Sequence, residues 1–162
     1  MGILTFKGGV HPYDGKELSK NSPVVKYLPK GDMVYPLSQH IGAPAVPLVA
    51  KGDRVLMGQK IAEGQAFISA NIHSSVSGTV KSIEPRLTAT GMKVNAIIVE
   101  NDGLYEAVEA EPQTKKIEEL EAGEIRALVK EAGVVGMGGA GFPTHVKLSP
   151  KNEGDIDTII VN

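Results

Sequence analysis

The residues best placed to do chemistry form one glycine-rich run near the end of the sequence. Five glycines occupy nine positions from Gly133 to Gly141, and Pro143 and Lys147 follow closely. Glycine loses more backbone freedom on folding than any other residue, so such a run is typical of backbone that approaches a ligand or adopts a positive φ. Bare amides, a proline at a helix start and a lysine one turn later favour a phosphate. A flexible surface loop is the alternative interpretation.

The spacing Gly136-x-Gly138-x-x-Gly141 satisfies the pattern of dinucleotide-binding loops, but its context differs. In those proteins the loop follows a strand and opens the long helix of a β-α-β unit. Here a helical pattern comes before the glycines, so the ordinary Rossmann interpretation fails. A P-loop is excluded as well, because no Gly-Lys-Ser/Thr sequence follows.

The elements around the run can be predicted from periodicity. Apolar residues at helical spacing predict a helix over 117–132 that is capped by Gly133. Pro143 is expected to begin a short second helix. The β-branched run over 156–161 predicts a strand buried on both faces, as in a parallel sheet covered by helices. Because one strand is not a sheet, we expect the chain to be a truncated piece of a longer protein.

Composition excludes several classes of function. The chain has 162 residues, 41% hydrophobic and 22% charged, with a net charge of −2, so it gives no electrostatic case for nucleic acid. It contains no cysteine, which excludes disulfides, thiolate catalysis and iron–sulfur ligation within these residues. No apolar run approaches the roughly 20 residues of a transmembrane helix. The four histidines are far apart and predict no metal site, and His145 is expected to face solvent on the first turn of the short helix.

Four regions are predicted along the chain: an extended arm over 1–36, a β module over 37–100, an acidic linker over 101–116, and the beginning of an α/β domain over 117–162. Residues 1–35 are expected to be irregular because prolines exclude a long helix. The arm is expected to wrap another part of the fold, or else to bind a partner. Its expected anchors are Ile3, Leu4, Phe6, Val24 and Val25. Strands are predicted at 45–49, 54–57, 75–83 and 94–100.

The β module resembles a biotinyl/lipoyl carrier domain in two segments, 51–62 and 72–80. In a carrier domain the modified lysine sits on a hairpin between these two segments. No lysine occurs here between Lys60 and Lys81, so the resemblance implies a barrel-sandwich hybrid fold without the swinging-arm function. The fold class is therefore predicted as mixed α and β, with a barrel-sandwich hybrid (biotinyl/lipoyl-like) module followed by the start of a truncated α/β domain.

Several strings in the right order resemble the N-terminal part of the C subunit of the Rnf electron-transport complex. The glycine run is also similar to the FMN loop of the flavoprotein subunit of complex I, where an arginine stands at the position of Met137. The matching strings are Gly8-Gly9-Val10-His11-Pro12, Gly15-Lys16, the segment from Pro36 to Pro44, the segment from His73 to Gly78, and the segment from Val135 to Lys147.

The resemblance implies that the truncated α/β domain is the beginning of an FMN/NADH-binding domain. Backbone amides of the glycine run would approach the flavin and its phosphate, and Lys147 would pair with the phosphate. Phe142 would stack against the nicotinamide dinucleotide, and Asn162 would begin the next flavin-contacting segment. The flavin accepts the hydride, so no catalytic side chain is expected. The residues implied in cofactor binding are Gly136, Gly138, Gly139, Ala140, Gly141, Phe142, Lys147 and Asn162.

The resemblance also implies a setting. The family passes electrons between ferredoxin and NAD, coupled to ion translocation, and its C subunit lies peripherally on the cytoplasmic side of the bacterial membrane with other Rnf subunits as partners. The 4Fe-4S clusters belong to a C-terminal region that is missing here, so this fragment is expected to be inactive by itself. Two alternatives stay open: a corrinoid reductase that shares the glycine loop, and a docking module without chemistry.

Overall fold

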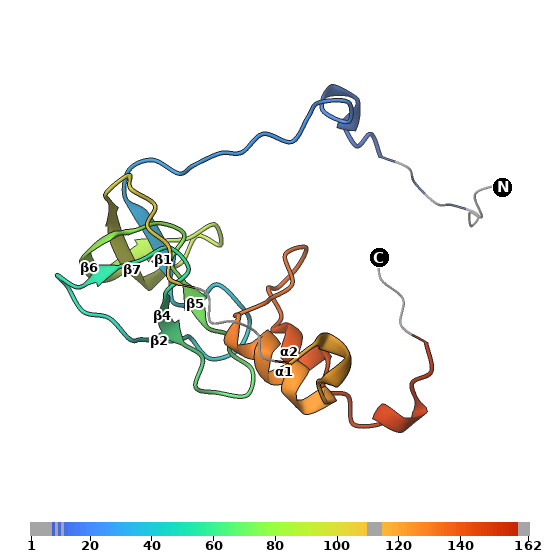
Figure 1. Ribbon diagram of the computed structural model, residues 1–162. Helices are drawn as coiled ribbons and strands as arrows, with labels where there is room; N and C mark the ends of the chain where they lie inside the picture. Colours follow the sequence, from blue (N-terminus) through green and yellow to red (C-terminus); the bar gives the residue numbers. More distant parts are fainter. Residues whose placement is uncertain (1–7, 9, 11, 110–114, 159–162) are drawn as a thin grey trace.

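The computed structural model describes residues 8, 10, 12–109 and 115–158. Two antiparallel sheets pack together, and a small helical unit lies against one end of them (Figure 1). We call residues 33–101 the β module and residues 117–158 the α unit. The four-stranded sheet has the order β1 (Met33–Pro36), β7 (Lys93–Asn101), β6 (Gly78–Leu87) and β3 (Arg54–Val55), and the three-stranded sheet has the order β2 (Val46–Pro47), β4 (Lys60–Glu63) and β5 (Ile72–His73).

The core of the β module lies between the two sheets. It consists mainly of β-branched side chains, which suit a pleated and half-buried surface. On β6 the side chains alternate: Val80 is buried, whereas Thr79 and Lys81 are exposed. The core members are Tyr35, Leu37, Ala45, Val55, Ile61, Ala62, Ile72, Val76, Val80, Ile97 and Val99. This arrangement confirms the predicted fold class.

Four of the seven strands lie within or overlap the predicted segments. β2, β3, β6 and β7 correspond to the predictions at 45–49, 54–57, 75–83 and 94–100. The other three, β1, β4 and β5, were not predicted. Residues 1–35 were expected to be irregular, and this is wrong for the last three of them. All four residues of β1 (Met33–Pro36) pair with β7.

The helix predicted over 117–132 is divided into two pieces. A 3-10 turn, η2 (Ile117–Glu119), comes first, and α1 (Ala122–Glu131) follows after Leu120, whose backbone is extended. A capping box causes the restart: the Glu121 N–H donates to Oε2 of Glu124 at 2.9 Å. At the other end Gly133 has a φ of 66°, which confirms the predicted cap.

After the glycines the prediction holds at first and then fails. α2 (Thr144–Lys147) begins directly after Pro143, as expected. The described part of the strand predicted over 156–161 is residues 156–158, which form an irregular segment directly after the 3-10 turn η3 (Glu153–Asp155). Residues 159–161 lie outside the described residues. Ile156 is 46% exposed, and within the described chain no strand pairs with this segment. A strand needs a neighbour to satisfy its backbone, which explains the difference.

The arm leaves the β module instead of wrapping it (Figure 1). It contains one short 3-10 turn, η1 (Lys16–Leu18), and is otherwise irregular. The expected anchors Val24 and Val25 are 102% and 78% exposed, so the wrapping prediction is wrong for them. Ile3, Leu4 and Phe6 lie outside the described residues. The arm first holds the β module at Pro29, whose carbonyl accepts hydrogen bonds from Asn101 Nδ2 and Tyr105 OH at 2.8 and 2.6 Å.

The first part of the predicted linker lies on the β module. Met57 exchanges backbone hydrogen bonds with Glu106 and Val108, at 2.8 and 3.0 Å. Arg54 forms ion pairs with Asp102 and Glu106, at 3.0 and 2.6 Å. The pKa of Asp102 is lowered by the Leu104 N–H first, then by the Ser77 hydroxyl and Arg54. Residues 110–114 lie outside the described residues.

Candidate functional site

The glycine loop, residues 136–142, is closed at its base by backbone pairing. Val135 and Pro143 form an isolated antiparallel bridge. The Gly136 N–H donates to the Phe142 carbonyl at 3.0 Å, and the Thr144 N–H donates to the Val134 carbonyl at 2.9 Å. The Gly136 amide is therefore used to close the loop, which differs from its expected role of facing a flavin.

The tip of the loop presents bare backbone to the surroundings. Residues 137–140 are exposed, and Met137 is 97% exposed. A Cβ built on Gly138 or Gly139 would meet nothing within 4 Å. Within the described part of the chain, no hydrogen bond engages the amides of residues 137–140. These amides remain available as donors, which is the property expected of an anion-binding loop.

Lys147 places its charge at the base of the same loop. A Cβ added to Gly136 would lie 2.7 Å from Lys147 Nζ, so the ammonium group rests against this glycine. The contact arises because α2 turns the chain back over the loop after Pro143. The structure thus places the Lys147 ammonium group at the base of the loop whose tip carries the exposed amides. Phe142 is half-buried beside them, and Asn162 lies outside the described residues.

The β module holds the glycine loop through the segment before β2. The Ile41 N–H donates to the Ala140 carbonyl at 3.0 Å. Gly141 has a φ of 63° and packs so closely that an added Cβ would lie 2.8 Å from the Gln39 carbonyl oxygen. Sequence reasoning missed this contact, although the segment from Pro36 to Pro44 is one of the family-like strings.

His40 fixes the conformation of that holding segment. It is buried, the Ala70 N–H donates to its Nε2 at 3.2 Å, and its Nδ1 donates to the Ile41 carbonyl at 3.2 Å. Both ring nitrogens are therefore used, and the proton of the neutral ring lies on Nδ1. His40 supports the loop without facing it.

His145 corrects another expectation. It is only 6% exposed and does not face solvent. Its Nε2 donates to the Phe67 carbonyl at 3.0 Å, and the two rings meet edge to face with centroids 6.2 Å apart. His145 therefore joins α2 to the segment between β4 and β5. The structure thus gives His145 an attachment role, because it links the helix after the glycine loop to the β module.

A second junction joins the end of α1 to the three-stranded sheet. Asn71 Nδ2 donates to the backbone carbonyl and to Oε2 of Glu131, both at 3.2 Å. Lys60 Nζ lies 2.7 Å from Oε1 of Glu131, and this hydrogen bond is the largest cause of the raised pKa of Lys60. Next to them, burial lowers the pKa of His73, partly opposed by the charge of Glu131.

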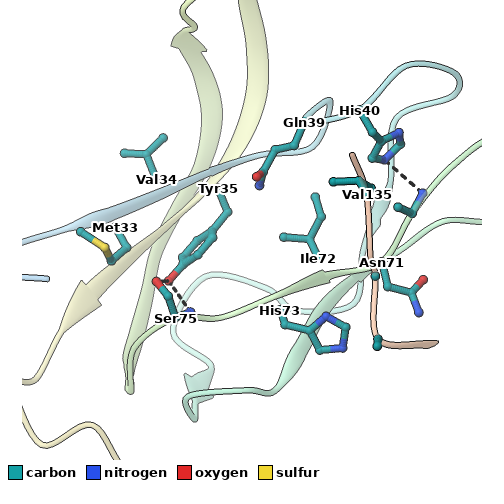
Figure 2. Close-up of a pocket in the computed structure, with 13 residues that line it drawn as sticks. Met33, Val34, Tyr35, Gln39, His40, Asn71, Ile72, His73, Ser75 and Val135 are labelled. Atoms are coloured by element: carbon teal, nitrogen blue, oxygen red, sulfur yellow. Dashed lines mark hydrogen bonds between the residues drawn. The ribbon is translucent and has the colours of Figure 1, made fainter. Parts of the chain in front are cut away.

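A cavity of about 490 Å³ lies between the edge strands β1 and β5 and the start of the glycine loop (Figure 2). Tyr35 reaches across it, and its hydroxyl bonds Ser74 and Ser75 at 3.2 and 2.9 Å. The lining includes Gly133 and Val135 but none of residues 136–142. The exposed tip of the loop is therefore not part of the wall of this cavity.

The described residues contain no group of three or more side chains that could hold a metal ion. In the part of the chain that the structure describes, we find no helix with the length and apolarity that a membrane crossing requires.

Comparison with known families gives two separate matches, one over the β module and one over the glycine loop. Residues 4–104 match the family described as the RnfC barrel sandwich hybrid domain, and residues 129–162 match the Nuo51 FMN-binding domain. The second match includes the whole glycine loop and Lys147.

Three relatives, each the C subunit of its complex, show how much of a longer protein is matched. The chain is 46% identical, over 99% of its length, to that of the proton-translocating ferredoxin:NAD(+) oxidoreductase complex of Clostridium ljungdahlii. It is 42% identical, over 98%, to the Na(+)-translocating counterpart of Acetobacterium woodii. It is 38% identical, over 90%, to the counterpart from the ion-translocating oxidoreductase complex of Vibrio cholerae. It spans 35%, 36% and 19% of these relatives, respectively.

Proposed function

The chain belongs to the RnfC family, as the N-terminal part of the C subunit of an Rnf complex, and from this premise we propose that its glycine loop binds the phosphate of FMN. The observation that carries the proposal is the position of Lys147 Nζ at the base of a loop whose tip has exposed amides without a hydrogen-bond partner among the described residues. Both are donors suited to a dianionic phosphate, and a charged hydrogen bond is about twice as strong as a neutral one. The match of residues 129–162 to an FMN-binding domain supports the same ligand.

The individual roles follow from the geometry around the loop. We propose that the amides of Gly138, Gly139 and Ala140 donate to the phosphate and that Lys147 supplies the countercharge. Gly136 and Gly141 serve to shape the loop, Gly136 by closing its base and Gly141 by packing against Gln39. We keep Phe142 as the stacking partner of the nicotinamide dinucleotide and Asn162 as the start of a further flavin contact.

The activity belongs to the whole subunit. The chain spans about a third of the length of the first two relatives, so a complete flavin pocket and its electron transfer are proposed for the longer protein. Bound FMN would accept a hydride from NADH, and electrons would pass between NAD and ferredoxin through 4Fe-4S clusters outside these residues. We propose that this reaction is coupled to ion translocation and occurs at the cytoplasmic side of the membrane, together with the other Rnf subunits.

The proposal is tested by titrating the chain with FMN and following flavin fluorescence. The variant Lys147→Ala should raise the Kd for FMN by about tenfold or more, because a charged hydrogen bond contributes about 1.5–3 kcal/mol. Lys151→Ala is the matched control, since Lys151 is exposed and lies on the turn after α2. It should change the Kd by less than about twofold.

Titration with riboflavin distinguishes the contribution of the phosphate to binding from that of the isoalloxazine ring. Without its phosphate the ligand should bind wild type and Lys147→Ala with equal affinity. If FMN binds both proteins equally well, or if the two variants lose the same affinity, the phosphate site is wrong. A docking role without chemistry would then be favoured.

A further inference from the structure

The arm presents an exposed extended segment, residues 23–28, just before it reaches the β module. Val24, Val25 and Tyr27 are 78–102% exposed. In the described part of the chain, no hydrogen bond engages residues 23–28, and the first attachment is the Pro29 carbonyl. Neighbouring β-branched and aromatic residues are typical of a strand, yet none of the described strands pairs with this segment. Apolar side chains and unpaired backbone groups are thus left open together.

The charge of this segment differs from the charge of the rest of the chain. Residues 19–31 contain three lysines, Lys20, Lys26 and Lys30, and no acidic residue, although the chain as a whole has a net charge of −2. All three lysines are exposed. A cationic and apolar segment is complementary to a surface that is acidic and offers apolar pockets.

We propose that residues 23–28, flanked by Lys20 and Lys30, dock in an extended conformation on an acidic, apolar-lined groove of another protein subunit. Because side chains alternate along a strand, Val25 and Tyr27 would enter pockets on one side while Lys26 faces the opposite way. The free backbone groups would pair with an exposed sheet edge of the partner, as in β-strand addition. This inference rests on the proposed place of the chain in a multi-subunit complex.

The backbone decides between a protein and a membrane as the partner. An extended segment cannot satisfy its own amides and carbonyls, and a bilayer core offers no partners for them. A protein edge supplies those partners. A protein is therefore the partner that we propose, and a neutral or anionic lipid surface is the alternative that the experiment must exclude.

The experiment measures binding of the fluorescently labelled chain to a detergent-solubilised Rnf complex that lacks its own C subunit. The triple variant Val24→Ser/Val25→Ser/Tyr27→Ser should raise the Kd at least tenfold, because it removes Val25 and Tyr27, the side chains that would enter the pockets, together with their exposed neighbour Val24. The matched control changes three exposed apolar residues of the β module and linker, Leu87→Ser/Met92→Ser/Leu104→Ser, and should alter the Kd less than twofold. Lys20→Gln/Lys26→Gln/Lys30→Gln should weaken binding at low salt and flatten its salt dependence.

Three further measurements make the result decisive. Vesicles of phosphatidylcholine and phosphatidylglycerol should bind wild type and the serine variant equally, and a selective loss on vesicles would overturn the proposal in favour of lipid. Equal binding of wild type and serine variant to the complex would overturn it, as would an arm-dependent dimer detected by sedimentation. FMN affinity should be the same in all arm variants, so a failure of docking remains distinct from a failure of the phosphate site.

Discussion

At the scale of single residues, the glycines of the glycine loop differ in whether their position could accept a side chain. Gly139 lies where an added Cβ would meet open space, whereas Gly141 has a positive φ and touches the Gln39 carbonyl. The first can accept a side chain without strain, although a methyl group would stand between a phosphate and the amides. The second cannot accept one without moving the chain.

Alanine substitutions should distinguish these two positions. Gly141→Ala should lower the free energy of unfolding by about 1–3 kcal/mol, because a non-glycine residue is strained at this φ and its Cβ would collide with Gln39. Gly139→Ala should leave stability within about 0.5 kcal/mol of wild type and raise the Kd for FMN. Urea denaturation and flavin titration measure the two effects. Equal stabilities for both variants would contradict the assigned geometry.

His73 should make stability depend on pH. Burial lowers its pKa in the folded protein below the usual value of 6.5, so the unfolded chain binds more protons in the window below that pH. The free energy of unfolding should therefore be level above about pH 6.5 and fall as the pH decreases through that value. His73→Gln should reduce this slope. A slope that is identical in wild type and variant, measured by denaturation at several pH values, would argue against the burial effect.

At the scale of elements, α1 depends on polar contacts more than on apolar burial. None of its residues is buried, and Ile125 and Leu128 are 38% and 44% exposed. Its C-terminal end is held by Asn71 and Lys60 from the β module. A short helix with so little burial needs such tertiary contacts, because isolated helices of this length are marginal in water.

Asn71→Asp should release the end of α1. The carboxylate can still accept the Gly64 N–H at 3.0 Å, but it faces the Glu131 carboxylate in place of donating to it. Amide exchange in 125–131 should accelerate by about tenfold, the factor that corresponds to losing about 1.4 kcal/mol. The amides of β6 and β7 serve as the internal control and should keep their protection. Unchanged exchange in α1 would show that Asn71 is not what holds it.

Periodicity predicted the elements whose signal is local. The long strands β6 and β7, the cap at Gly133 and the helix after Pro143 all agree with the sequence patterns. β4 and β5 are short and pair with each other across a register shift, and β1 forms by pairing with β7, which is far from it in sequence. The glycine loop was predicted as a motif, but its attachment through His40, Gly141 and His145 depends on tertiary contacts that periodicity does not reveal.

At the scale of the whole molecule, apolar burial is concentrated in the β module. Among the described residues, the buried hydrophobic side chains lie between Tyr35 and Val99. In the α unit Gly141, Pro143 and His145 are buried, and of these Gly141 and His145 contact the β module, at Gln39 and Phe67. The two parts therefore differ in their sources of stability, hydrophobic burial in one and polar attachment in the other.

Residues 29–109 should fold without the rest of the chain. They include every strand that the structure describes, the core, and the Pro29 contacts that fix the start of the module. We expect dispersed amide NMR signals and a cooperative thermal transition for this piece. We also expect exchange in the α unit of the 162-residue chain to be faster than exchange in the β module. A disordered spectrum for 29–109 would show that the α unit is required for the core to form.

The hydrogen bond from Ile41 to Ala140 joins a surface loop of the sandwich to the apex of the glycine loop. A displacement of residues 39–41 would also displace the glycine loop, since Gly141 packs closely against the same segment. Any partner that shifts residues 39–42 would thereby alter the affinity for an anion on the loop, and the anion would alter the partner's affinity by the same factor. Under the proposed function, partner binding at residues 39–42 and FMN binding at the loop would share one thermodynamic cycle.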